Sequence, residues 1–203
     1  MDNINMIPVD NISEKLKNAV VGIAGLGGLG SNVAVSLTRI GIGKLILIDF
    51  DKVDKSNLNR QQYFLRHIGM YKTEALKEVL NDINPDIELE STNIFVDETN
   101  IEQLFKDVDI IVEAFDNSQS KATLVNTTLL KMPDKPIVAG SGMAGYFSSN
   151  SIKTRKIRNN FYLAGDEFSD IDLGYTPFAP RVNIVANHQA NMVLRLILGE
   201  NDV

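Results

Sequence analysis

The sequence predicts an α/β fold, in which a mostly parallel sheet carries helices on both of its faces. Short apolar segments alternate along the chain with segments whose apolar residues repeat at helical spacing, and this alternation is typical of parallel sheets. Two of the apolar segments end in an aspartate, Asp49 and Asp116, which places polar side chains at one edge of the sheet. We expect residues 1–203 to form a single domain, because no linker rich in proline, glycine or serine divides them.

The first half of the chain is expected to hold two buried strands and two helices. The apolar residues 19–24 form the first strand, and a helix begins after the glycines that follow it. Residues 44–48, KLILI, form a second buried strand. A polar stretch then leads to a helix over about residues 72–84, which Pro85 ends because proline cannot continue a helix.

The second half is expected to continue this alternation, with one irregular feature. Residues 145–154 are predicted to form an antiparallel strand, which gives the sheet a short antiparallel extension near the C-terminus. Aromatic residues before the last helix belong either to the core or to a docking surface, and the core is the expected place. The other predicted elements are strands over residues 87–95, 108–115 and 136–139 and helices over about residues 118–131 and 181–198.

The composition excludes several classes of protein. Hydrophobic residues make up 44% of the chain and charged residues 23%, as in an ordinary globular protein, and no apolar run approaches the roughly 20 residues of a membrane span. The polar N-terminus lacks the layout of a signal peptide, so we expect a cytoplasmic protein. The chain has no cysteine, which excludes thiolate zinc sites, and only two histidines. A net charge of −6 with dispersed lysines and arginines makes nucleic acid an unexpected partner.

The turn GLGGLG after the first strand predicts a nucleotide site. Gly25, Gly27 and Gly30 satisfy the pattern G-x-G-x-x-G between a strand and a helix. Glycine permits the tight turn and lets backbone N–H groups approach a phosphate at the positive end of a helix. Asp49, at the end of the second strand, is placed to bind a ribose hydroxyl. The pattern therefore predicts a Rossmann-like site, and by itself it favours NAD without excluding ATP.

The segment after the second strand carries more polar groups than an NAD site needs. It contains Asp51, Asn57, Arg60 and Gln61, and Lys72 follows at the start of the next helix. Arginine grips phosphate oxygens through two parallel hydrogen bonds, and lysine supplies a compact mobile charge. Either cation alone would be an ordinary surface charge, but Arg60 and Lys72 together favour a triphosphate such as ATP.

Three segments together resemble the adenylyltransferase family that includes ThiF, MoeB, HesA and the ubiquitin-activating enzymes. They are the turn GLGGLG, the long motif DFDKVDKSNLNRQ of residues 49–61 with the later IGMYK, and the pair Asp116-Asn117. The resemblance extends over nearly the whole chain, as far as the helix within residues 177–199. Because it is short and has no cysteine, the chain is most similar to a compact ThiF-type member.

The resemblance implies an enzyme that uses ATP and Mg²⁺. The C-terminal carboxylate of a small ubiquitin-like sulfur carrier protein, usually ending in Gly-Gly, attacks the α-phosphate of ATP, pyrophosphate leaves, and an acyl-adenylate forms. Charge stabilisation and alignment carry such a step, so it requires no general base. The resemblance also implies a homodimer and a role in thiamine biosynthesis, a chemistry that molybdopterin and other sulfur pathways share.

The resemblance further implies which residues act. Arg60 and Lys72 counter the charge that builds at the α-phosphate, and Asp116 lies beside Mg²⁺, so these three are the implied catalytic residues. Gln61 supports Arg60, and Asn117 caps the next helix beside the base. The implied nucleotide-binding residues are Gly25, Gly27, Gly28, Gly30, Asp49, Asp51, Asn57, Arg60, Gln61, Lys72, Asn117 and Lys121.

The chain departs from the family in ways that keep two alternatives open. Without cysteine it holds no structural zinc and forms no thioester, so any sulfur comes from another donor. Its first arginine is Arg39, so the N-terminal arginine of relatives is missing, and Lys121 stands where relatives have an arginine. Residues 140–145 either line a channel for a Gly-Gly tail or form an ordinary connection. The alternatives to adenylation are an NAD-dependent oxidoreductase and a nucleotide-binding scaffold without turnover.

Overall fold

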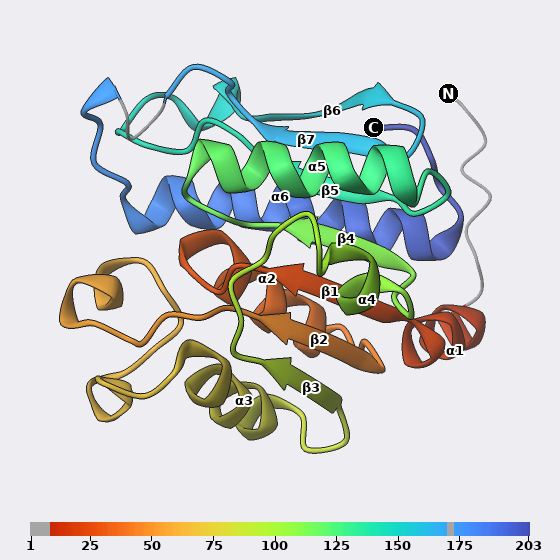
Figure 1. The fold of residues 1–203 in the computed structure, drawn as a ribbon, viewed down its shortest axis with the longest axis horizontal. Coiled ribbons are helices and arrows are strands. Elements are labelled where there is room, and N and C mark those ends of the chain that lie inside the picture. The colour runs from red at the N-terminus through yellow and green to blue at the C-terminus, as the bar shows by residue number, and fades with distance from the viewer. Residues whose placement is uncertain (1–8, 170–172) are drawn as a thin grey trace.

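The computed structural model describes residues 9–169 and 173–203, and it contains one seven-stranded sheet (Figure 1). The strand order is β3-β2-β1-β4-β5-β7-β6, and every neighbouring pair is parallel except β6 and β7. The predicted α/β fold, with its short antiparallel extension, is therefore confirmed. The strands are β1 (Val20–Ala24), β2 (Lys44–Ile48), β3 (Glu88–Thr92), β4 (Ile110–Glu113), β5 (Ile137–Gly140), β6 (Lys153–Arg158) and β7 (Phe161–Gly165).

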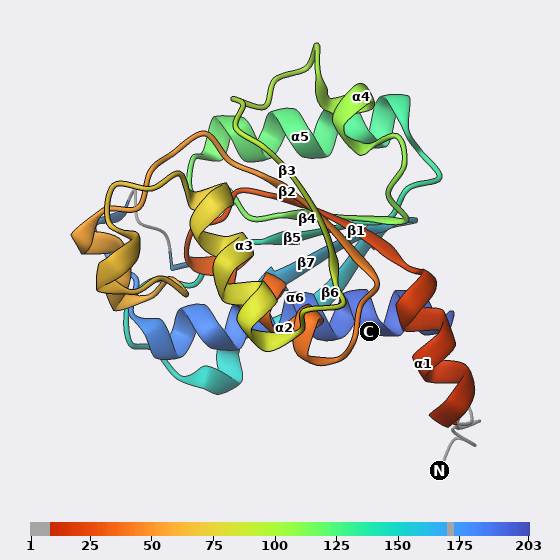
Figure 2. The same ribbon diagram turned by 90° about the horizontal axis from the view of Figure 1, so that it is seen from below.

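Helices cover both faces of the sheet (Figure 2). α2, α3 and α6 lie on one face, and α4 and α5 lie on the other. No helix in the described part of the chain is long and apolar enough to cross a bilayer. The helices are α1 (Val9–Asn18), α2 (Gly28–Arg39), α3 (Lys72–Ile83), α4 (Ile101–Phe105), α5 (Ser118–Lys131) and α6 (Ala179–Leu198).

Each face of the sheet has its own apolar core. Leu45 and Leu47 of β2 enter the larger core, under α2, α3 and α6, whereas Ile46 and Ile48 enter the smaller one, under α4 and α5. Successive residues of a strand point to opposite faces, so a central strand covered on both sides must be apolar throughout. This explains the uninterrupted run KLILI and places the polar residues of the chain at the strand ends.

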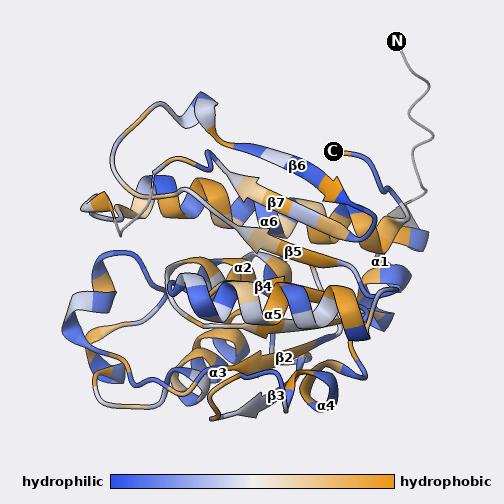
Figure 3. Ribbon diagram, turned by 45° about the horizontal axis from the view of Figure 1, so that its top comes forward, coloured by the Kyte–Doolittle hydropathy of each residue, from blue (hydrophilic) through white to orange (hydrophobic). Residues whose placement is uncertain are grey.

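The antiparallel strand predicted over residues 145–154 is wrong in position. Gly145 forms only an isolated bridge to Pro177, and the antiparallel strand is β6, which begins at Lys153. Most of β6 is hydrophilic (Figure 3), because it is an edge strand, and an apolar pattern therefore does not mark it. β7 follows it and pairs in parallel with β5, and Tyr162 of β7 is completely buried, as expected for a core residue. The expectation that the aromatic residues before the last helix belong to the core is wrong for Phe168 and Phe178, which are exposed.

Gly30 is expected to tolerate no side chain. A Cβ at this position would lie 1.8 Å from the carbonyl oxygen of Gly25, in the turn that joins β1 to α2. Because backbone occupies the space, we expect Gly30→Ala to lower the free energy of unfolding by about 3 kcal/mol, measured by urea denaturation. Gly27→Ala is the control, since a Cβ there would be 3.7 Å from its nearest neighbour, the Gln61 amide. Equal losses in the two variants would contradict this account of Gly30.

Candidate functional site

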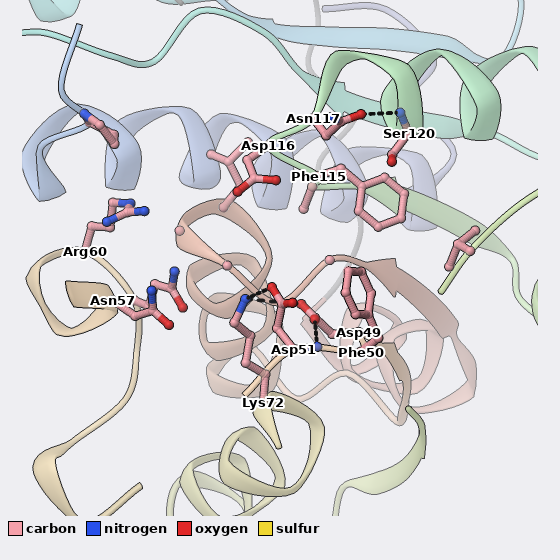
Figure 4. A pocket seen from close by; sticks show the side chains of 18 of the residues that line it. Asp49, Phe50, Asp51, Asn57, Arg60, Lys72, Phe115, Asp116, Asn117 and Ser120 are labelled. Atoms are coloured by element: carbon pink, nitrogen blue, oxygen red, sulfur yellow. Dashed lines mark hydrogen bonds and ion pairs between the residues drawn. The ribbon is translucent and has the colours of Figure 1, made fainter. Parts of the chain in front are cut away.

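A cavity of about 660 Å³ opens at the carboxyl ends of the central strands (Figure 4). We call it the first cavity; its volume is in the range of small-molecule sites. Gly30 and Lys121 are the predicted site residues that do not line it. The predicted residues that do line it are Gly25, Gly27, Gly28, Asp49, Asp51, Asn57, Arg60, Gln61, Lys72, Asp116 and Asn117.

The glycines of the turn divide into two functions. Gly25 has φ +88°, and a Cβ there would lie 2.8 Å from the carbonyl oxygen of Ala114, so Gly25 shapes the turn, as Gly30 does by packing. Gly27 and Gly28 line the first cavity at the start of α2. The first N–H groups of a helix have no partner within it, and they carry partial positive charge. This end of α2 is therefore suited to an anion.

Asp49 and Tyr63 hold the turn through the backbone of Leu26. The Asp49 carboxylate accepts a hydrogen bond from the Leu26 N–H at 2.6 Å and another from the Asp51 N–H at 2.8 Å. The Tyr63 hydroxyl donates to the Leu26 carbonyl at 2.7 Å. Burial raises the pKa of Tyr63 well above its ordinary value, so the hydroxyl remains a donor at neutral pH. Sequence reasoning did not identify Tyr63, because nothing in the pattern links it to a residue 37 positions away.

Tyr63→Phe should weaken the fold measurably through this one hydrogen bond. The substitution leaves the buried Leu26 carbonyl without its hydroxyl donor, and we expect the free energy of unfolding to fall by about 1–3 kcal/mol in urea denaturation. Tyr71→Phe is the matched control, because Tyr71 is exposed and its change should cost less than about 0.5 kcal/mol. Unchanged stability of Tyr63→Phe would show that the hydroxyl does not hold the turn.

Lys72 is the buried cation of the first cavity. Its Nζ lies 2.7 Å from Asp51 Oδ2 and 3.8 Å from Asp49 Oδ2, at the start of α3 (Figure 4). Burial raises the pKa of Asp49, although the Lys72 charge and two backbone N–H donors oppose the change. Lys72 thus already has anionic partners, and a phosphate would compete with Asp51 for it.

Arg60 is the second cation that the structure brings to the cavity, and its partners lie in its own loop. Its guanidinium donates to Asn59 Oδ1 at 2.8 Å, and its carbonyl accepts from Asn32 of α2 at 3.0 Å. Gln61 was predicted to support Arg60, but in the described part of the chain the two form no hydrogen bond, and the buried Oε1 of Gln61 has no partner. Asn57 accepts a hydrogen bond from the Asp54 N–H at 3.0 Å and so orders the loop that presents Arg60.

Asp116 and Asn117 follow β4 at the opposite wall of the cavity. Asn117 caps α5 by accepting a hydrogen bond from the Ser120 N–H at 3.0 Å, as its residue type predicts. Asp116 is exposed and faces the cavity (Figure 4). Within the described ranges, no three acidic or histidine side chains gather as a metal site. A Mg²⁺ ion beside Asp116 would therefore take most of its oxygen ligands from a bound phosphate and water.

A second cavity, of about 340 Å³, adjoins the first. It shares Asp116 and Met143 with the first cavity, and it is lined by residues 140–144, α5 and β7. Lys121 lies here, not in the first cavity: its Nζ is 3.0 Å from Glu113 Oε2 and donates to the Gly140 carbonyl at 2.8 Å. Burial raises the pKa of Glu113, and Lys121 opposes that change. Lys121, which was predicted to contact a phosphate, thus lies between the sheet and the second cavity.

A buried ion pair joins the start of α6 to the loops that contain residues 147–148 and 166, and sequence reasoning missed it. Arg181, in the first turn of α6, lies 2.5 Å from Asp166 and donates to the carbonyls of Phe147 and Ser148. Burial alone would raise the pKa of Asp166, but backbone and hydroxyl hydrogen bonds, chiefly from Ser169, and the charge of Arg181 outweigh it and lower the pKa. No local motif marks such a pair, because its members lie 15 residues apart.

The fold and the site define a Rossmann-like α/β protein that presents a glycine turn, two cations and a strand-end aspartate to one cavity. The family follows from comparison with known proteins. The chain belongs to the ThiF family, whose model matches residues 2–203. The resemblance found in the sequence is therefore confirmed.

Individual relatives cover different parts of the chain. A tRNA threonylcarbamoyladenosine dehydratase of Bacillus subtilis is 36% identical over 64% of this chain and 52% of its own length. The adenylyltransferase and sulfurtransferase UBA4 of Kluyveromyces lactis is 37% identical over 64% of this chain and 29% of its own. The chain thus spans about half or less of these relatives. The structure of the E. coli dehydratase TcdA in complex with ATP has a TM-score of 0.85 over 94% of this chain and 90% of that one, at 21% identity, which shows the same fold.

Proposed function

We propose that this chain transfers AMP from ATP to the C-terminal carboxylate of a small ubiquitin-like sulfur carrier protein, in thiamine biosynthesis. The observation that carries the proposal is the convergence of the glycine turn, Arg60, Lys72 and Asp116 on the first cavity. The Kluyveromyces lactis relative is an adenylyltransferase by name, which supports the type of reaction. Family membership favours this function over NAD-dependent hydride transfer, and neither histidine lines either cavity.

The lining of the first cavity suits the parts of ATP. The edge of the cavity around Phe50, Phe95 and Phe115 is apolar and suits a base, and the first two rings already pack edge to face at 5.4 Å. Asp49 retains acceptor capacity for ribose hydroxyls beyond its two backbone bonds. The start of α2 and the two cations then suit the phosphates.

The proposed step requires charge stabilisation but no proton transfer. The carrier carboxylate is ionised at neutral pH; its oxygen forms a bond to the α-phosphorus while the bond to the bridging oxygen breaks, and pyrophosphate leaves with that electron pair. Arg60 and Lys72 stabilise the charge that develops on the phosphates. Lys72 must exchange Asp51 for a phosphate oxygen, a short movement because both lie at the same cavity wall. Mg²⁺ beside Asp116 would withdraw further charge from the phosphates.

The second cavity supports a path for the carrier tail. Gly140, Ser141, Gly142 and Ala144 line it with small side chains or none, and it meets the first cavity at Asp116 and Met143. An extended Gly-Gly segment needs little width, so its terminal carboxylate would reach the α-phosphate from this side.

We propose further that the enzyme acts as a cytoplasmic homodimer. Light scattering on the purified chain measures its mass and so tests the dimer.

The experiment that tests the function is carrier-dependent exchange of labelled pyrophosphate into ATP. Purified chain, MgATP and ubiquitin-like proteins ending in Gly-Gly from the same genome should give exchange, and a carrier without its last two glycines should give none. Tight NAD binding without exchange would overturn the proposal in favour of an oxidoreductase. ATP binding without exchange for any carrier would overturn it in favour of a scaffold.

A further inference from the structure

Strand β6 is one of the two edge strands of the sheet, and its charge differs from that of the molecule. Four of its six residues are Lys or Arg, in a chain of net charge −6. α5, which lies nearest along the same face, contains two lysines and no acidic residue. In Figure 3, β6 lies at the margin of the molecule and is hydrophilic over most of its length. β6 is therefore a basic strand at one margin of an acidic protein.

In the part of the chain that the structure describes, no helix packs extensively on the face of β6 and β7 that lies on the α5 side. α6 packs on β5, β7 and β6 from the opposite side, whereas α5 packs on β4 and β5. Phe161 and Leu163 of β7 are half-buried on this face, and both line the second cavity. The uncovered part of the sheet is thus continuous with the cavity that receives the carrier tail in the proposed function.

Two basic residues of β6 stand directly beside that cavity. Arg155 pairs with Leu163 across the two strands, and Arg158 pairs with Phe161. Directly opposed residues of neighbouring strands project to the same face. Arg155 is partly neutralised by Glu167, but within the described ranges Arg158 and Lys153 have no ion-pair partner. Both side chains are exposed.

We infer that the β6 margin, defined as Lys153, Arg155 and Arg158 with the uncovered face of β7, docks an acidic face of the carrier protein. The inference rests on the proposed function, because the tail that enters the second cavity must come from a body seated on this face. Opposite charge at the edge of an interface accelerates encounter and excludes partners of like charge. The structure thus assigns to β6 the selection of acidic carriers.

The test measures carrier binding and exchange with the double variant Lys153→Glu/Arg158→Glu. Calorimetric titration without nucleotide, at about 50 mM salt, should show a dissociation constant for the Gly-Gly carrier raised about tenfold or more, and about 300 mM salt should weaken the wild type similarly. The KM for ATP should not change. Lys17→Glu/Lys106→Glu, which reverses two exposed lysines elsewhere, is the control with the same net charge and should bind like the wild type.

Each other outcome overturns a distinct claim. Equal losses in both double variants, or no loss in either, would overturn the docking face. A salt-sensitive gel shift of tRNA that only Lys153→Glu/Arg158→Glu abolishes, with carrier binding intact, would assign the margin to RNA and overturn it likewise. If no carrier binds the wild type in the titration without nucleotide, the proposed docking face is wrong. Salt-sensitive binding lost in the variant, with no exchange in the wild type, would sustain docking and overturn the proposed adenylation alone.

Discussion

Removal of either cation from the first cavity is expected to lower kcat for pyrophosphate exchange by about 10²–10³-fold. Arg60→Ala and Lys72→Ala each delete a positioned charge where negative charge develops, and losses of this size follow the removal of one such group from other enzymes. Lys72→Ala has a further cost, because Asp49 and Asp51 lose their cation and then repel a phosphate. The KM for ATP should rise as well, most in Lys72→Ala.

The controls for this prediction are cations near the site in sequence but outside the cavity. Lys77→Ala lies on the same helix as Lys72, and Arg66→Ala changes an exposed arginine six residues from Arg60. Both should retain kcat within about twofold, since neither side chain lines the cavity. If they fall as far as the cavity variants, the effect is general electrostatics, and the assigned roles of Arg60 and Lys72 are wrong.

Arg181→Ala is expected to lower the free energy of unfolding by about 3–5 kcal/mol. Both members of the pair with Asp166 are more than 90% buried, so the substitution leaves an uncompensated buried carboxylate and frees the carbonyls of Phe147 and Ser148. Arg195→Ala on the same helix is the control, because its partner Asp202 is exposed and the pair should contribute less than about 1 kcal/mol. Urea denaturation measures the free energy of unfolding of both variants. Similar losses in the two would contradict the larger contribution of the buried pair.

The same pair gives stability a defined dependence on pH. The folded pKa of Asp166 lies below its ordinary value of 3.8, so the folded chain holds the charged form more strongly than the unfolded chain does. This contribution is complete above that ordinary value and is lost as the pH falls through the folded pKa. The Arg181→Ala variant should therefore show a weaker loss of stability on acidification than the wild type.

The sequence allowed the central part of the fold to be predicted, because its physical signals are local. The run LILI of β2 is apolar throughout, and the glycine turn stands between a strand and a helix, so β1, β2 and α2 follow from neighbouring residues. α5 was predicted with its observed bounds, since Asn117 caps its start. The cavity residues at the strand ends were predicted for the same reason, because parallel strands end at a common edge.

The elements at the edges of the fold lack local sequence signals of this kind. β6 is exposed and charged, so no apolar period marks it, and the short β7 lies between β5 and β6 with α6 packed on one face. α1 was not predicted, since its amphipathic pattern lies in a polar N-terminal segment. Tyr63 and Arg181 act on backbone atoms distant in sequence, a property that no single-chain pattern encodes.

The hydrogen bonds that Asp49 and Tyr63 make to the backbone of Leu26 affect the thermodynamics of nucleotide binding. The N–H and the carbonyl of Leu26 are both engaged by side chains of the chain itself, so the order of the glycine turn requires no contact from a nucleotide. Binding then loses little backbone entropy at the turn, in contrast to loops that fold around their ligand. The turn should superpose between free and loaded states, and the preorganisation should appear as a fast, nearly diffusion-controlled association that depends little on loop rearrangement.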